Sequence, residues 1–280
     1  MKRKIFIQTL LLSSGGIFLS GSMCLKNWKP DKNSFRLLMI YNNIGKSSSL
    51  INGWGLAVWI EKEKSATLFD TGGDASVLWK NIRETGIDIK NLSKIVISHN
   101  HWDHKNGLNL ILEKTFNQPE VYIVEKDLTE YKSLLPNVKL TGISHARQID
   151  QEIWTTGQLK GFIGGSEIYE QSVILDTEQS VCILTGCSHP GIVNIVRTTR
   201  GIFPDKDIAF VAGGFHLMEK SEKEIREISN ELKALKVNTI APSHCTGSLA
   251  ISIFREEWGD KMIDFNLGQH LHPEQWDKAI

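Results

Sequence analysis

The chain has 280 residues, of which 41% are hydrophobic and 23% are charged, so it is long enough to bury a sizeable core and is not a disordered chain. Lysine and arginine together number 32, and aspartate and glutamate also number 32. This balance provides no overall basic field that would attract nucleic acid and no acidic excess that would attract cations. Any charged ligand must therefore be bound by local groups.

The first 24 residues have the pattern of an export segment. Basic residues at 2–4 precede an apolar run at 5–12, and small residues follow to about residue 22. A first core helix is the alternative, but serines and glycines at 13–16 interrupt it. We predict a signal peptide or N-terminal membrane anchor over 1–24, and a protein that is periplasmic or anchored on the outer side of the inner membrane.

Beyond a polar linker, short apolar runs alternate with longer amphipathic stretches, which is typical of an α/β domain. Strands are predicted at 35–41, 55–60, 66–70, 94–98, 121–124, 172–175, 181–185, 208–212 and 239–242. Helices are predicted at 75–85 and 221–235, and Ser221 and Glu224 form a capping-box pattern at the start of the second. We predict one domain over 34–280, with two strand-rich halves that meet near residue 160 and suit a sandwich of two sheets covered by helices.

The most informative motif is His99-x-His101-x-Asp103-His104, directly after the predicted strand at 94–98. Three imidazoles and a carboxylate within six residues cannot all be satisfied as ordinary core contacts, so they predict a cation. In an extended loop the side chains of His99 and His101 point the same way and can share one metal, while Asp103 and His104 turn toward a second.

Three further histidines each follow a predicted strand and a turn: His189, His216 and His244. Strands that end in this way can bring their histidines to one edge of a sheet sandwich, which supports two adjacent metals. Two such ions would lie about 3.5–4 Å apart and would acidify a bridging water to hydroxide.

The His-x-His-x-Asp-His loop, an upstream Asp70-Thr71-Gly72-Gly73 and a late strand-end histidine resemble the metallo-β-lactamase superfamily. The segments 185–189 (Thr-Gly-Cys-Ser-His), 213–217 (Gly-Gly-Phe-His-Leu) and 243–247 (Ser-His-Cys-Thr-Gly) are similar to a subfamily of metal-dependent hydrolases. That subfamily includes proteins named 7,8-dihydropterin-6-methyl-4-(ribofuranosyl)aminobenzene 5′-phosphate synthases. The resemblance covers roughly residues 35–265 and implies a four-layer αββα sandwich.

The resemblance also implies a set of metal ligands. One metal would be bound by His99, His101 and His189, and the other by Asp103, His104 and His244. Asp70 would orient the ligand loop without touching a metal.

Position 187 departs from the pattern of the superfamily, in which an aspartate there commonly bridges the metals. The chain has Cys187 instead. The thiolate could be a ligand, His189 could take over, or water alone could bridge; we favour His189, because a borderline metal readily accepts imidazole. The cysteines at 24, 182, 187 and 245 contain no C-x-x-C pair, and although one disulfide is an alternative, we predict reduced cysteines near the metals.

Other histidines and aromatic residues have less defined roles. His216 could be a seventh ligand, a general acid or a binder of substrate phosphate, and we favour the last two roles. His145 is a reserve candidate for a third ligand. The remaining candidates are His270 and His272, predicted to be solvated or tail residues, and Trp54, Trp102, Trp154 and Phe215, which could line a pocket but are more typical of packing.

We therefore predict a hydrolase in which a hydroxide on two divalent metals attacks a phosphoester, ester or amide of a small-molecule substrate, with Asp103 able to hold or relay a proton. Zinc is favoured, with manganese or iron as alternatives. The alternative function is condensation or transfer on a pterin-like phosphate, as the name of the subfamily members suggests. Diiron oxidoreductases are disfavoured by His101, where they typically have glutamate, and a purely structural metal is disfavoured because two adjacent ligand sets imply open positions. We predict no nucleic-acid partner, and membrane attachment only through the N-terminal segment.

Overall fold

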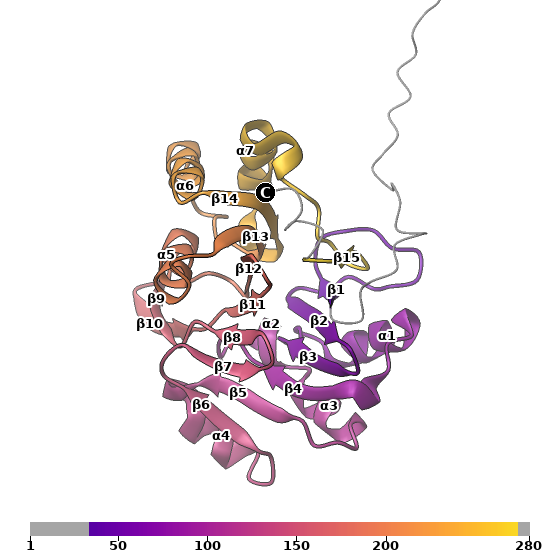
Figure 1. Cartoon of the computed structure of the whole chain (residues 1–280). Helices are drawn as coiled ribbons and strands as arrows, with labels where there is room; N and C mark the ends of the chain where they lie inside the picture. Colours follow the sequence, from indigo (N-terminus) through magenta and orange to yellow (C-terminus); the bar gives the residue numbers. More distant parts are fainter. Residues whose placement is uncertain (1–33, 274–280) are drawn as a thin grey trace, which may run out of the picture. The chain divides into compact units, whose positions relative to one another are not determined.

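Two sheets form the centre of the fold in the computed structural model, which describes residues 34–273 (Figure 1). The predicted export segment at 1–24 lies outside the described residues and stays a prediction. Within 34–273, no helix is both long enough and apolar enough to cross a bilayer.

The larger sheet of the described chain has seven strands in the order β15-β1-β2-β3-β4-β5-β6. The bounds are β1 (Phe35–Asn42), β2 (Leu56–Lys62), β3 (Ser65–Phe69), β4 (Leu92–Val96), β5 (Glu120–Val124), β6 (Leu140–Ile143) and β15 (His270–Leu271). Strands β15, β1, β2 and β3 pair antiparallel, whereas β3, β4, β5 and β6 are parallel. The carboxyl ends of these four parallel strands therefore meet at one edge.

The second sheet of the described chain has six strands in the order β14-β13-β12-β11-β8-β7. The bounds are β7 (Arg147–Asp150), β8 (Ile153–Thr155), β11 (Val173–Asp176), β12 (Ser180–Thr185), β13 (Asp207–Gly214) and β14 (Val237–Ser243), and a separate hairpin consists of β9 (Leu159–Ile163) and β10 (Ser166–Glu170). Strands β12, β13 and β14 are parallel, so this sheet also has an edge at which carboxyl ends meet.

Helices cover the outer face of each sheet. The α-helices are α1 (Ala75–Thr85), α2 (Trp102–Lys105), α3 (Leu108–Lys114), α4 (Leu128–Leu134), α5 (Ile192–Ile202), α6 (Glu222–Ala234) and α7 (Ser248–Trp258). The 3-10 turns are η1 (Ile89–Asn91), η2 (Glu125–Asp127), η3 (His244–Thr246) and η4 (Gly259–Lys261). Figure 1 shows α5, α6 and α7 beside β12–β14, and α1, α3 and α4 beside the larger sheet.

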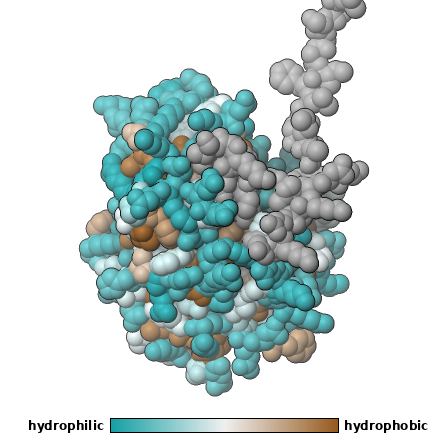
Figure 2. Space-filling model, in the orientation of Figure 1, coloured by the Kyte–Doolittle hydropathy of each residue, from teal (hydrophilic) through white to brown (hydrophobic). Residues whose placement is uncertain are grey.

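Three buried apolar clusters fill the spaces between these layers. Alternation along β12 illustrates the arrangement: Cys182 and Leu184 pack in the cluster between the sheets, whereas Val181 and Ile183 pack against the helices on the other face. A third cluster joins the larger sheet to α1, α3 and α4. The predicted four-layer αββα sandwich is therefore confirmed. On the face drawn in Figure 2 the surface is mostly hydrophilic, with scattered apolar residues.

Each predicted strand and both predicted helices correspond to an observed element, with ends that differ by at most two residues. The predicted division near residue 160 is wrong, because the chain passes from the first sheet to the second between β6 and β7, near residue 145. The strands between 140 and 170 are short and partly exposed, so their sequences lack the continuous apolar runs that mark buried strands.

Helix α6 begins with the predicted capping box. The Ser221 side chain accepts a hydrogen bond from the backbone N–H of Glu224, and the Glu224 carboxylate accepts from the backbone N–H of Ser221. These bonds satisfy two backbone donors that the first helical turn would leave unpaired.

Replacing Ser221 by alanine should lower the free energy of unfolding by about 1 kcal/mol, because alanine lacks the hydroxyl that accepts from the Glu224 backbone N–H. Urea denaturation monitored by circular dichroism measures the change. Asn230→Ala on the exposed part of the same helix is the control and should change the value by less than about 0.5 kcal/mol. Equal losses in both variants would contradict a specific role for the cap.

Candidate metal centre

The histidine-bearing loops all begin at the carboxyl ends of strands. The loop after β4 carries His99 and His101, and the loops after β12, β13 and β14 carry His189, His216 and His244. Because the parallel strands of each sheet end at a common edge, these loops meet, as the sequence predicted.

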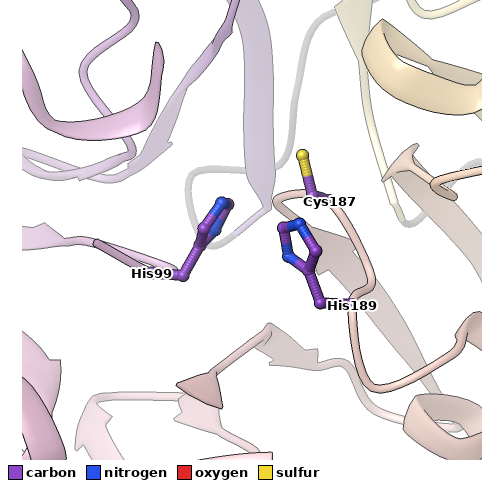
Figure 3. Close-up of side chains that lie close together, drawn as sticks. All are labelled: His99, Cys187 and His189. Carbon is purple, nitrogen blue, oxygen red and sulfur yellow. The ribbon is translucent and has the colours of Figure 1, made fainter. Parts of the chain in front are cut away.

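The first group of side chains consists of His99, His101 and His189. The ring centroid of His99 lies 4.7 Å from that of His101 and 4.6 Å from that of His189. The ring centroids of His101 and His189 are 4.9 Å apart. The Nε2 atom of His99 is 3.0 Å from Nδ1 of His101. In Figure 3, His99 and His189 face each other from the loops after β4 and β12, with Cys187 near His189.

The second group consists of Asp103, His104 and His244. The Nε2 atoms of His104 and His244 are 3.2 Å apart, and Oδ2 of Asp103 lies 3.7 Å from the first and 3.4 Å from the second. The ring centroids of His99 and His104 are only 4.3 Å apart, so the two groups are adjacent. The structure thus brings all six predicted ligands together in one place, and their division between two metals stays a prediction.

Hydrogen bonds to Nδ1 orient three of the imidazoles. Asp70 Oδ2 is 2.6 Å from Nδ1 of His104, and Asn43 Oδ1 is 2.7 Å from Nδ1 of His244. Glu170 Oε2 lies 2.8 Å from Nδ1 of His189. Each partner fixes the ring and leaves its Nε2 directed into the cluster, as outer partners of metal-bound histidines do.

These side chains fit divalent metal ions. The Nε2 atom of His189 is buried without a hydrogen-bond partner, and the side chain is only 1% exposed. Such an orphaned nitrogen is costly unless a ligand satisfies it. The facing nitrogens at 3.0 and 3.2 Å are close to the roughly 3.3 Å expected between two nitrogens that share a tetrahedral zinc ion.

Cys187 lies between the two groups. Its Sγ is 3.2 Å from Nε2 of His104, and it belongs both to a cluster with His99 and His189 and to one with His104 and His244, in each of which the ligand atoms lie within 4.8 Å of one another. This geometry therefore allows both Cys187 and His189 to be metal ligands, so one does not exclude the other. All three described cysteines are reduced and buried.

The protonation states of the cluster determine how readily it binds a cation. Burial opposes ionisation of Asp103, but its hydrogen bond with His244 and the charge of His104 lower its pKa to about 2. Burial and the neighbouring His104 lower the pKa of His99 well below its usual range. Asp103 is thus ionised and His99 neutral at pH 7, the states in which both bind metals. Burial also disfavours a charged His104, yet Asp70 raises its pKa to about 9, so a cation must displace a proton there.

Four of the eight non-glycine residues with a positive φ angle in the described chain belong to the loops of this site. Asp70, Ser188, His216 and His244 have positive φ angles of 60°, 63°, 52° and 50°. A non-glycine residue in this region costs roughly 1–3 kcal/mol, and such strain persists where surrounding contacts determine it and where function uses it. The turns that aim these histidines are therefore held by the fold rather than by local preference.

The other candidates have different surroundings. The ring of His216 is half-buried, and its centroid is 4.5 Å from that of His189, but it is outside both ligand groups. His145 is exposed in the turn between β6 and β7, where its Nδ1 is 2.9 Å from the Ser144 hydroxyl, and it belongs to neither ligand group. The prediction that His270 and His272 are solvated or tail residues is wrong: His270 belongs to the edge strand β15, and His272 is buried.

Two of the four aromatic candidates lie at the site and two do not. The ring centroids of Trp54 and His244 are 5.2 Å apart, with the ring planes tilted by 59°, and Trp54 is 43% exposed. Trp102, next to His101 in the sequence, is 54% exposed. Trp154 packs against Phe203, and Phe215 is buried against Phe254. The last two therefore pack in the interior.

Sequence reasoning missed the residues that support the ligand loops. Glu170 accepts hydrogen bonds from the backbone N–H groups of Cys187, Ser188 and His189 at 2.8–2.9 Å. The adjacent Gln171 donates its backbone N–H to the Ser98 carbonyl. Isolated Glu and Gln residues before a strand form no motif, so only the tertiary contacts identify them.

Replacing Glu170 by glutamine should destabilise the metal-free chain by about 3 kcal/mol at pH 7. Burial opposes ionisation of Glu170, but its bonds with His189 and the loop lower its pKa to about 2. A lowered pKa contributes stability above the unfolded value near 4.5 that is lost as the pH falls toward 2. Urea denaturation at pH 7 and pH 2.5 should therefore show a large difference between wild type and variant only at pH 7; the same difference at both pH values would contradict this role.

The family model of the metallo-beta-lactamase superfamily matches residues 55–244. A 7,8-dihydropterin-6-methyl-4-(beta-D-ribofuranosyl)-aminobenzene-5′-phosphate synthase of Methanocaldococcus jannaschii is 29% identical over 269 residues, covering 80% of this chain and 92% of that protein. The solved structure of Tm1679, a metal-dependent hydrolase of the beta-lactamase superfamily, is 27% identical with a TM-score of 0.69, covering 85% of this chain and 98% of that one. A diphosphatase from the PhnP family, 16% identical, shares the fold with a TM-score of 0.57, covering 85% of this chain and 96% of that one. Since the family model spans more than half of the sequence, the chain belongs to the metallo-beta-lactamase superfamily.

Proposed function

We propose that this chain is a metal-dependent hydrolase of small-molecule phosphoesters, esters or amides. The observation that carries the proposal is the pair of adjacent ligand groups, whose nearest rings, those of His99 and His104, are 4.3 Å apart. When bound there, two divalent cations supply Lewis acidity and a water nucleophile that ionises near neutral pH. Five imidazoles and one carboxylate favour zinc, with manganese or iron as alternatives.

The chain's own residues would bind and orient the reacting groups. Ionised Asp103 faces His104 and His244, where it can bind a metal ion or accept a proton. His216 stands at the border of the cluster, and a hydrogen bond with Cys245 raises its pKa. A half-buried imidazole at this border, with its pKa raised by a neighbouring thiol, suits the role of general acid toward a leaving group.

The border of the site favours a substrate with an apolar or planar part. Trp54 and Trp102 are exposed there, and Met218, which lies two residues after His216 and against Gly247, is 59% exposed. Exposed indoles can stack on planar rings and contribute to binding by area and by ring geometry. The balanced charge of the chain supports a small molecule rather than nucleic acid as the partner.

Metal content tests the two-cation part of the proposal. Elemental analysis of the purified protein should give about two metals per chain, and His104→Ala should give about one or none because it removes a ligand of the second group. His145→Ala, at an exposed histidine outside the cluster, is the matched control and should keep about two. A wild-type chain that binds no metal under any loading condition would contradict the proposal.

Leaving-group dependence tests His216. The variant His216→Gln should lose roughly 10²–10⁴-fold in kcat on an alkyl phosphodiester, because the alkoxide leaving group needs a proton. On a 4-nitrophenyl phosphodiester the loss should be much smaller, since nitrophenolate leaves without one. Both assays require unchanged metal content, and equal losses on the two substrates would instead indicate a positioning role.

A second candidate function is condensation or transfer on a pterin-like phosphate. Its support is the synthase of Methanocaldococcus jannaschii, which covers most of this chain, together with the exposed indoles of Trp54 and Trp102. A metal-loaded chain that hydrolyses no phosphoester, ester or amide but joins a pterin-like substrate to an acceptor, detected by mass spectrometry of the products, would favour this function over hydrolysis.

A further inference from the structure

We infer that the thiolate of Cys187 is a ligand shared by both cations, and this inference rests on the two-cation site of the proposed function. Cys187 is the residue common to the two clusters, one with His99 and His189 and the other with His104 and His244. Its Sγ lies 3.2 Å from Nε2 of His104, and the residue is only 3% exposed. The single Sγ atom of Cys187 is therefore within reach of both ligand groups.

The backbone at this position is fixed independently of any metal. The N–H groups of Cys187 and Ser188 both donate to Oε1 of Glu170 at 2.8 Å, and Ser188 has a φ of 63°. The Ser188 hydroxyl also donates to the Gly214 carbonyl on the neighbouring strand. The thiol is therefore presented to the cluster by a rigid turn.

The nearby buried carboxylates are already engaged. Glu170 accepts from the backbone of 187–189 and is paired with Nδ1 of His189, while Asp70 accepts from Ser98 and is paired with Nδ1 of His104. Both carboxylates stand on the far side of an imidazole from the cluster. Neither is placed to join the two groups.

Charge balance also calls for an anionic ligand here. The first group offers only imidazoles, and the second adds one carboxylate, Asp103. Two divalent cations in a buried site carry a large positive charge that neutral ligands do not offset. A coordinated cysteine is deprotonated outright, so Cys187 would add a negative charge between the groups.

Cys245 is the natural control for this assignment. It is equally buried, and its Sγ donates to the Cys187 carbonyl at 3.6 Å. However, it clusters with Cys187 and His216 rather than with the histidines of the two ligand groups. Removal of this thiol should leave the proposed metal coordination in place.

Cobalt(II) substitution tests the inference by absorption rather than by activity. The chain loaded with cobalt should show an intense thiolate-to-cobalt charge-transfer band in the near ultraviolet. Cys187→Ser should abolish the band and weaken binding of the second cobalt by more than about 100-fold, which exceeds the roughly 10- to 100-fold loss usual when only an outer partner of a ligand is removed. Cys245→Ser should retain the band, and Cys187→Asp should bind about two cobalt ions without it.

Two half-site variants test the sharing itself. His189→Ala removes a ligand of the first group, and His244→Ala removes one of the second, so each should retain about one cobalt ion. The charge-transfer band should persist in both, at about half of its wild-type intensity, because the same sulfur serves either ion. Circular dichroism and the melting temperature of each variant establish that it is folded.

The outcomes separate this inference from the proposed function. Two bound cobalt ions without a charge-transfer band would overturn the inference and leave the two-cation hydrolase standing. A band confined to one half-site variant would make Cys187 a ligand of a single ion and would overturn the sharing. Absence of cobalt from the wild-type chain would contradict the proposed function itself.

Discussion

The geometry of the histidine cluster depends on two buried carboxylates that hold the ligand loops. Asp70 binds the backbone N–H of Ser98 and Nδ1 of His104, and Glu170 binds three consecutive backbone N–H groups and Nδ1 of His189. An ionised carboxylate is buried at great cost unless its lone pairs are satisfied, so each one specifies a single arrangement of donors. That arrangement aims Nε2 of both imidazoles into the same space.

Both sheets contribute loops to this arrangement. Parallel strands in each sheet end at an edge, and the loops that follow carry the cluster. Between the sheets, Gln171 donates its side-chain amide to the Ile97 carbonyl, and its side-chain oxygen accepts from the Thr155 hydroxyl. Glu170 and Gln171 therefore tie the loop after β4 to the loop after β12, one from each sheet. These two adjacent residues therefore hold the two ligand groups in place relative to each other.

The chemistry of the cluster and the character of its border fit a metal-dependent enzyme of this superfamily. The interior offers neutral imidazoles and the ionised Asp103, with Cys187 between the groups. The border offers the exposed indoles of Trp54 and Trp102, which suit a small substrate with a planar or apolar part. The strained turns at His216 and His244 are preserved because the packed strands beneath them determine their conformation.

The sequence by itself determined the buried strands, the capped helix and the ligand motifs, because each depends on residues close together in the chain. Only the tertiary structure decided which distant residues support the ligands. Asn43 lies 201 residues from His244, whose Nδ1 it holds, and Gln171 lies 74 residues from Ile97, whose carbonyl it binds. Cys187 likewise meets His104, 83 residues away, only because loops from both sheets pack together, and no local pattern encodes that distance.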